Sequence, residues 1–227
     1  MTVKLGLMVP ANNTTMEPEL LAWMADTQCT TQRIPRGQGL LGPAEIPACV
    51  APALELARGY DRNQTDIVAY GCTAAGFIGG PARDAEIQAS LATITGKPVV
   101  TTASAMIAVL RHIGAQHIAV VTPYLDLVNE RLRAYLEQSG ITVVKLGSFK
   151  AATTDELAKI TPLQIAALAR ETMTSDADAM FIACSQLPTK NIMDGLEREF
   201  GKPVWSSIKA TAWHAERVLA DKKTIAA

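Results

Sequence analysis

The stretch that decides the fold is Asp66-Ile67-Val68-Ala69-Tyr70-Gly71-Cys72-Thr73-Ala74-Ala75-Gly76-Phe77, where a short apolar run ends in a cysteine and small or hydroxylated residues follow. In proteins that alternate strands and helices, a buried parallel strand delivers a side chain in this way to the carboxyl edge of its sheet, where such folds bind ligands. The same construction returns at Asp178-Ala179-Met180-Phe181-Ile182-Ala183-Cys184-Ser185-Gln186. The chain is therefore interpreted as two copies of one unit, each bringing one thiol to a shared cleft.

The repeat extends beyond these two stretches. The two aspartates are 112 residues apart, as are the two cysteines, and the strand-ending Pro10 and Pro123 are 113 apart. Gly96-Lys97-Pro98-Val99 returns as Gly201-Lys202-Pro203-Val204, at an offset of 105. An offset that holds at several landmarks indicates duplication. Two like units related by a pseudo-twofold axis place their strand ends face to face, so Cys72 and Cys184 are expected to flank one ligand.

Apolar runs alternate with helical patterns along the chain, which is typical of parallel sheets covered by helices. The patterns predict strands over residues 3–9, 30–34, 66–70, 97–101, 116–122, 142–146, 179–183 and 203–206. They predict helices over residues 16–25, 46–60, 82–93, 103–113, 124–139, 163–174, 190–200 and 210–219, with a frayed tail beyond Asp221. The predicted fold is α/β, with two pseudo-symmetric parallel-sheet domains of flavodoxin-like type and the active site between them. Residues 1–104 and 207–227 would form the first domain, and residues 105–206 an inserted second domain.

Composition excludes several classes of function. The 227-residue chain is 48% hydrophobic and 19% charged, as in ordinary globular proteins. Its net charge of −1 gives no electrostatic reason to expect nucleic acid or an anionic membrane as a partner. The N-terminal apolar run is too short for a secretory signal, and no run reaches the roughly 18 apolar residues of a membrane span. The sequence predicts a cytoplasmic protein.

The four cysteines form no CxxC pair and lie near no histidine at zinc-finger spacing, and no strand is followed by a nucleotide-binding glycine motif. We therefore expect free thiols, no metal and no cofactor. Cys29 and Cys49 are interpreted as small packing residues. Cys72 and Cys184 are interpreted as functional because they occupy equivalent points of the repeat.

Two opposed thiols allow two related reactions on a small carboxylate. One thiolate can remove a proton while the other thiol returns one on the opposite face, or one thiolate can add to a double bond while the other thiol protonates the neighbouring carbon. Thr73 and Ser185 follow the two cysteines directly, and their hydroxyl and N–H groups, with small Ala74 beside them, suit carboxylate oxygens. A thiol pKa near 8.5 must fall for thiolate to form, and helix N-termini after both cysteines are the expected cause.

Further candidates follow the strand-ending prolines. Asn13 can bind a substrate carboxylate or cap the next helix, and both alternatives stay open. Tyr124 occupies the matching loop of the second unit, where its hydroxyl can face the cleft or its ring can pack in the core. The Gly/Pro-rich loop of residues 35–43 is a candidate lid or a passive connection.

The strings Val9-Pro10, Asn13-Thr14-Thr15-Met16-Glu17, Thr122-Pro123-Tyr124 and Ala183-Cys184, together with Cys72, resemble the maleate cis-trans isomerases of the aspartate/glutamate racemase superfamily. The resemblance runs over nearly the whole chain. It implies that Cys72 is a nucleophile that forms a succinyl-cysteine adduct and that Cys184 is the proton donor. It also implies a homo-oligomer. The residues it implies for holding the substrate carboxylates are Asn13, Thr73, Ala74, Tyr124, Ser185 and Gln186.

Residues 125–132, residues 97–102 and the pair Cys184 and Thr189 resemble the arylmalonate decarboxylases instead. Those enzymes have glycine where this chain has Cys72, because they need one thiol to protonate an enediolate. Other departures from the isomerases fall at positions expected to determine which substrate shape fits. Thr154 replaces an asparagine, and the loop of residues 35–43 is nearer the decarboxylase pattern.

Three hypotheses follow from these observations. The first is a cofactor-independent isomerase of a small unsaturated dicarboxylate, of the maleate-to-fumarate type. The second is a racemase of an amino-acid-like or hydantoin-like substrate, or an arylmalonate-type decarboxylase, on the same scaffold. The third is a non-catalytic small-ligand binding protein, since a fold does not fix a function.

Overall fold

The computed structural model describes residues 2–35 and 41–225, with side chains described as far as Asp221. The first sheet is parallel, in the order β2-β1-β3-β4, and the second is parallel in the corresponding order β6-β5-β7-β8. The strand bounds are β1 Val3–Pro10, β2 Thr27–Ile34, β3 Ile67–Tyr70, β4 Val99–Thr101, β5 His117–Thr122, β6 Thr142–Ser148, β7 Ala179–Ile182 and β8 Val204–Ser206. The two four-stranded sheets confirm the predicted α/β fold.

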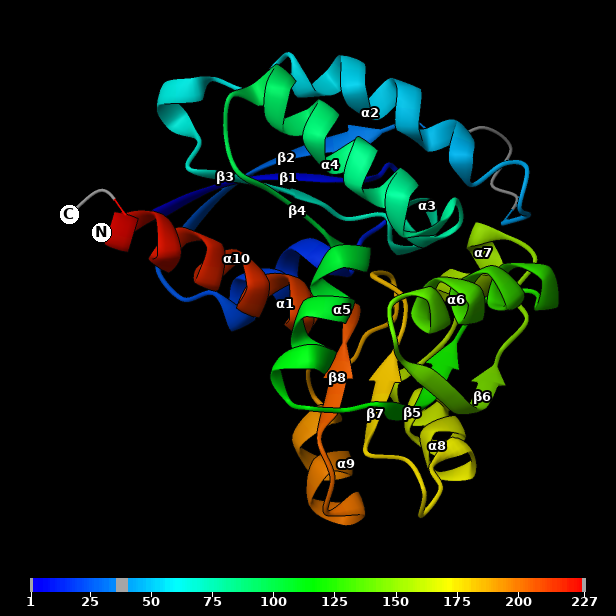
Figure 1. Ribbon diagram of the computed structural model, residues 1–227. Helices are drawn as coiled ribbons and strands as arrows, with labels where there is room; N and C mark the ends of the chain where they lie inside the picture. The colour runs from blue at the N-terminus through cyan, green and yellow to red at the C-terminus, as the bar shows by residue number, and fades with distance from the viewer. Residues whose placement is uncertain (1, 36–40, 226–227) are drawn as a thin grey trace.

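Helices cover both faces of each sheet (Figure 1). Their bounds are α1 Met16–Trp23, α2 Val50–Ala57, α3 Thr73–Phe77, α4 Gly80–Thr95, α5 Thr102–His112, α6 Asp126–Gln138, α7 Thr154–Ala158, α8 Pro162–Thr172, α9 Met193–Phe200 and α10 Ser207–Ile225, with 3₁₀ turns η1 Pro47–Cys49 and η2 Arg62–Gln64. α10 leaves the second sheet and packs on α1 and α5 beside the first. The predicted domain boundary at residues 104–105 falls inside α5, which contacts α3, α4 and α10, and it stays a prediction.

The two repeated aspartates have the same structural role. Asp66 precedes β3 and its carboxylate accepts a hydrogen bond from Lys4 N, at the start of β1. Asp178 precedes β7 and accepts from Gln116 N and His117 N, at the start of β5. These backbone hydrogen bonds hold the pKa of Asp178 below its usual range. Each aspartate thus fixes the register between the first and third strands of its unit.

Several predicted elements need correction. The helix expected over residues 46–60 is shorter, consisting of η1 and α2, since Pro47 and Pro52 interrupt the regular pattern. α3 and α7 were not predicted, because a five-residue helix is too short to show a helical period. The last helix does not end near Asp221 but continues to Ile225. Most of the loop of residues 35–43 lies outside the described residues, so its interpretation as a lid is untested.

Candidate active site

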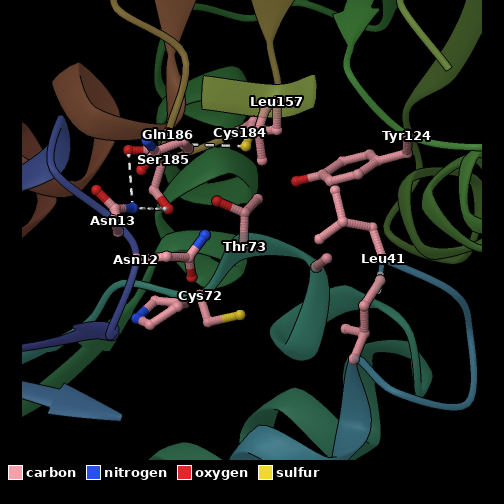
Figure 2. A pocket seen from close by; sticks show the side chains of 13 residues that line it. Asn12, Asn13, Leu41, Cys72, Thr73, Tyr124, Leu157, Cys184, Ser185 and Gln186 are labelled. Carbon is pink, nitrogen blue, oxygen red and sulfur yellow. Dashed lines mark hydrogen bonds between the residues drawn. The ribbon is translucent and has the colours of Figure 1, made fainter. Parts of the chain in front are cut away.

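The carboxyl ends of β1, β3, β5 and β7 meet at one pocket between the two halves of the molecule (Figure 2). Every site residue predicted from the sequence lines it: Asn13, Cys72, Thr73, Ala74, Tyr124, Cys184, Ser185 and Gln186. The lining also includes five residues that the prediction did not assign to the site: Pro10, Asn12, Leu41, Ile46 and Leu157. The repeat located the strand ends correctly, whereas the additional side chains come from the last residue of β1, from loops and from the unpredicted α7.

Cys72 is buried and stands immediately before α3, as the cap residue of that helix. The preceding Gly71 turns the chain where no side chain fits, because a Cβ there would lie 2.5 Å from Met16 Sδ and 2.9 Å from Met8 O. Gly71 N also donates to Met8 O, which ties the turn to β1. A helix N-terminus does follow this cysteine, but it belongs to the unpredicted α3 and not to the helix expected over residues 82–93. The first turn of α3 leaves N–H groups without intrahelical acceptors, beside the pocket.

Cys184 is equally buried, but no helix begins directly after it; the next helix was expected over residues 190–200. The chain forms a turn in which Gln186 N donates to Cys184 Sγ at 3.4 Å and Leu187 N donates to Cys184 O. The next helix, α9, begins only at Met193. The thiol of the second half is therefore supported by a turn, and its surroundings differ from those of Cys72.

Asn13 caps the next helix, which is one of the two roles that the sequence left open, and it also contacts the second half of the molecule. Its Oδ1 accepts hydrogen bonds from Thr15 N and Met16 N, which caps the start of α1. Its Nδ2 donates across the cleft to Ser185 O and Ser185 Oγ, both at 3.2 Å. The second half is tied to the same loop by Gln186, whose side chain accepts from Thr14 N. Asn13 thus fixes the turn after Cys184 against the first half.

Two polar atoms in the pocket are buried and have no hydrogen-bond partner among the described residues. They are the hydroxyl of Thr73 and Oδ1 of Asn12. Buried polar groups in native proteins are nearly always satisfied, so such atoms in a pocket call for a partner from water or a ligand. Ser185 Oγ, in contrast, donates to Gly71 O at 2.6 Å, which joins the two cysteine segments directly. Asn12 precedes the predicted Asn13 in the same polar turn, and that turn was the available signal for it.

Tyr124 has both of the proposed roles. Its ring is almost fully buried and packs edge-on against Phe77 of α3, with 5.5 Å between ring centroids. Figure 2 shows its hydroxyl directed toward the centre of the pocket. Asn129 of α6 donates to Tyr124 O at 2.8 Å, so the backbone before α6 is held from within the second half.

One wall of the pocket is apolar and comes from both halves. Leu41 and Ile46 belong to the first half, and Leu157 of α7 to the second. Leu41 N donates to Ala152 O, so the halves are hydrogen-bonded at this end as well. Thr154, which was aligned with an asparagine of the isomerases, is not among the lining residues, and α7 presents Leu157 instead. Among the described residues there is no group of His, Cys, Asp or Glu suited to a metal ion, and no helix long and apolar enough to cross a membrane.

Comparison with known proteins agrees with this geometry. The family model described as arylmalonate decarboxylase matches residues 5–227. The chain belongs to this family. It is 30% identical to the maleate isomerase of Nocardia farcinica over 95% of this chain and 90% of the relative. It is 27% identical to the arylmalonate decarboxylase of Bordetella bronchiseptica over 80% of this chain and 77% of the relative.

A solved structure of the Nocardia farcinica enzyme is similar to the whole chain. It is a cysteine-to-serine mutant of the maleate cis-trans isomerase with a covalently bound succinylcysteine intermediate. It superimposes with a TM-score of 0.89 at 29% identity and covers 96% of this chain and 93% of the neighbour. Two activities therefore occur among proteins similar to this chain, and the residues of its own pocket distinguish them.

Proposed function

We propose that this protein is a cofactor-independent cis-trans isomerase of a small unsaturated dicarboxylate, of the maleate-to-fumarate type. The observation that carries the proposal is the presence of two buried cysteines at equivalent strand ends, both lining one pocket. A decarboxylase needs one thiol to protonate its enediolate, whereas addition to a double bond needs a nucleophile and a proton donor. The similarity to maleate isomerases over nearly the whole chain supports the same reading.

In the proposed reaction the Cys72 thiolate forms a C–S bond to one alkene carbon, and the electron pair of the double bond moves to the neighbouring carbon, where a carboxylate stabilises it. The Cys184 thiol gives its proton to that carbon, which leaves a succinyl group on Cys72 and a thiolate at Cys184. The central C–C bond is then single and rotates. The Cys184 thiolate removes the proton, the double bond re-forms in the trans configuration, and Cys72 departs as thiolate.

The proposal assigns substrate binding to the polar groups around the two thiols. The Thr73 hydroxyl, buried with no partner among the described residues, and the N–H groups of Thr73 and Ala74 in the first turn of α3 suit one carboxylate. The Tyr124 hydroxyl and the backbone of Ser185 and Gln186 suit the other. Asn13 contributes by holding Ser185 in place. The apolar wall favours a substrate that carries a small apolar substituent, such as a 2-alkyl maleate.

Racemisation is the second candidate, and the symmetry of the two thiols favours it. A racemase uses one thiolate as base and the opposite thiol as acid, and it forms no covalent adduct. We further propose that residues 1–104 with 207–227 and residues 105–206 act as two domains around the pocket, and that the protein is a cytoplasmic homo-oligomer. The resemblance to the isomerases supports the oligomer, and light scattering on the purified protein measures it.

Proton NMR in deuterium oxide tests the proposal. The purified protein is given, in separate tubes, maleate, 2-methylmaleate, phenylmalonate and glutamate. Appearance of the trans alkene from either maleate supports the isomerase. Loss of carbon dioxide from phenylmalonate, or exchange of the α-proton of glutamate without any alkene isomerisation, contradicts it and identifies which alternative holds.

A further inference from the structure

A carboxylate outside the pocket holds the turn that follows Cys184. Glu19 of α1 is not a lining residue, but it accepts three hydrogen bonds from the second half of the molecule. The donors are Thr189 N at 2.8 Å, Thr189 Oγ1 at 3.1 Å and Lys190 N at 3.1 Å. No other described side chain of the first half makes as many hydrogen bonds to the second.

These bonds converge on the residue that ends the turn. Thr189 is fully buried, and its carbonyl accepts from Ile192 N and Met193 N, where α9 begins. The segment between Cys184 and Thr189 contains no helix or strand. Its anchors are Asn13 near the cysteine and Glu19 at the far end, both in the first half. The position of the Cys184 thiol therefore depends on the contacts of α1.

The carboxylate of Glu19 lies where partial burial disfavours its charged form. Its side chain is half-buried, and desolvation raises the pKa of its carboxyl, while the hydrogen bonds from Lys190 and Thr189 oppose that rise. The Lys190 ammonium lies over the Trp23 ring, 4.1 Å from its centroid, so the last turn of α1 has a second contact with this segment. A partly buried carboxylate with three donors has a defined geometry, unlike an exposed ion pair.

We propose that Glu19 is a positioning residue that holds the Cys184 turn for proton transfer. The proposal rests on the proposed isomerase reaction. Cys72 stands at the start of α3, which is anchored by its own helical bonds and by packing against α4, α5 and α6, none of which involves Glu19, so loss of Glu19 leaves addition by Cys72 intact. Proton transfer at Cys184 slows instead. Water can also protonate the carbanion, so the succinyl adduct still forms, whereas removal of the carbon-bound proton needs a positioned base, and the adduct therefore accumulates.

A quench experiment with maleate tests this inference. Glu19→Ala is compared with wild type and with Glu55→Ala, which removes a carboxylate of α2 that, among the described residues, forms an ion pair with exposed Arg58 alone. Each protein is mixed with excess maleate, quenched in acid at steady state and weighed by mass spectrometry. We expect Glu19→Ala to lose about tenfold in kcat while the adducted fraction rises severalfold above wild type. Glu55→Ala is expected to match wild type in both.

Thr189→Val serves as the second variant, since it removes one of the three donors and keeps the two backbone N–H groups. It is expected to show a smaller change in the same direction, so the inference stays testable if Glu19→Ala folds poorly. A fall in kcat with no rise in adducted fraction in these variants overturns the positioning role. Cys184→Ala is the reference: if it accumulates adduct and the Glu19 and Thr189 variants do not, the inference fails and the isomerase proposal stands. If Cys184→Ala accumulates none, the proposed function itself fails.

Discussion

The segments that follow the two cysteines differ, although the strands that deliver them are equivalent. After Cys72 the chain enters α3 at once, and the helix packs against α4, α5 and α6. After Cys184 the chain forms an irregular turn tied by side chains to α1 and the loop before it. Duplication preserved the delivery of the thiol to the cleft, and the support of each thiol diverged.

This difference suits the two roles proposed for the thiols. A nucleophile must approach one carbon from one direction, and a short helix fixed on three sides gives it a rigid base. A proton donor that later acts as a base must stay close to the same carbon atom before and after the substrate rotates. The turn that carries Cys184, held by hydrogen bonds from the first half, keeps the thiol in that position. The two cysteines thus occupy equivalent positions in the fold, but a helix follows Cys72 and an irregular turn follows Cys184.

The largest effect is expected from removing either thiol. Cys72→Ala and Cys184→Ala should each lower turnover of maleate about a hundredfold or more, as loss of a positioned nucleophile or proton donor does. Cys29→Ala, on β2 and outside the pocket, should leave turnover unchanged. Steady-state assays of the three variants measure this. Full activity in Cys72→Ala would contradict the nucleophilic role proposed for Cys72 and favour a reaction that needs one thiol.

The rigidity of α3 is tested by Gly76→Ala. A Cβ at this position would lie 2.7 Å from Ala103 Cβ and 3.0 Å from Asp84 Oδ1, so α3 must shift. Overpacking of this kind costs about 1–3 kcal/mol of unfolding free energy, and turnover should fall with it. Gly195→Ala in α9 is the matched control, because nothing lies within 4 Å of its added Cβ. Urea unfolding compares the two, and equal stabilities would contradict the tight support of α3.

The support of the Cys184 turn is tested by Asn13→Asp. The substitution keeps the oxygen that caps α1 and removes the donor to Ser185, while it adds a negative charge to the carboxylate pocket. We expect KM for maleate to rise about tenfold, with little change in Tm, because the added charge repels the substrate carboxylates and two neutral hydrogen bonds to Ser185 are lost, worth roughly 0.5–1.5 kcal/mol each. Kinetics and calorimetry on the same preparation separate the effect on KM from the effect on Tm. An unchanged KM with a large fall in Tm would leave Asn13 as a structural residue only.

The smallest effect is expected at Asp84, which lies behind α3 and accepts hydrogen bonds from Thr101 and from Tyr135 of the second half. Burial raises the pKa of its carboxyl, and those two hydrogen bonds oppose the rise. Because the folded-state pKa lies above the unfolded one, stability from this group is present at low pH and is lost as the pH rises through the folded pKa. The Tm of Asp84→Asn minus the Tm of wild type should therefore be larger at pH 8 than at pH 5. Calorimetry at both values checks the sign, and the opposite trend would contradict it.

Much of the fold and the site could be predicted from the sequence because the repeat fixed both at once. The common offset of the cysteines placed them at equivalent strand ends, and the prolines that end β1 and β5 marked the loops of Asn13 and Tyr124. Buried parallel strands leave continuous apolar runs, so their existence was predictable, whereas that of the short helices α3 and α7 was not.

The remaining features depend on tertiary contacts that no local pattern encodes. Glu19 looks like an ordinary residue of the first turn of a helix, and only the structure shows its three bonds to Thr189 and Lys190. Leu157 lines the pocket beside Leu41, and the segment just before α7 accepts a hydrogen bond from Leu41 N through Ala152 O. The hydrogen bonds that fix the turn after Cys184 could not be predicted either, since they join Ser185 and Gln186 to distant residues of the first half.

The central claim is that Cys72 bonds to carbon while Cys184 only moves a proton. The Cys184→Ala protein is incubated with maleate, quenched in acid and digested, and its cysteine peptides are sequenced by mass spectrometry. The account predicts one added succinyl group on the Cys72 peptide and none on the peptides of Cys29 and Cys49. An unmodified Cys72 peptide, together with α-deuterium in a substrate turned over by the wild-type protein in deuterium oxide, would contradict it and establish proton transfer alone.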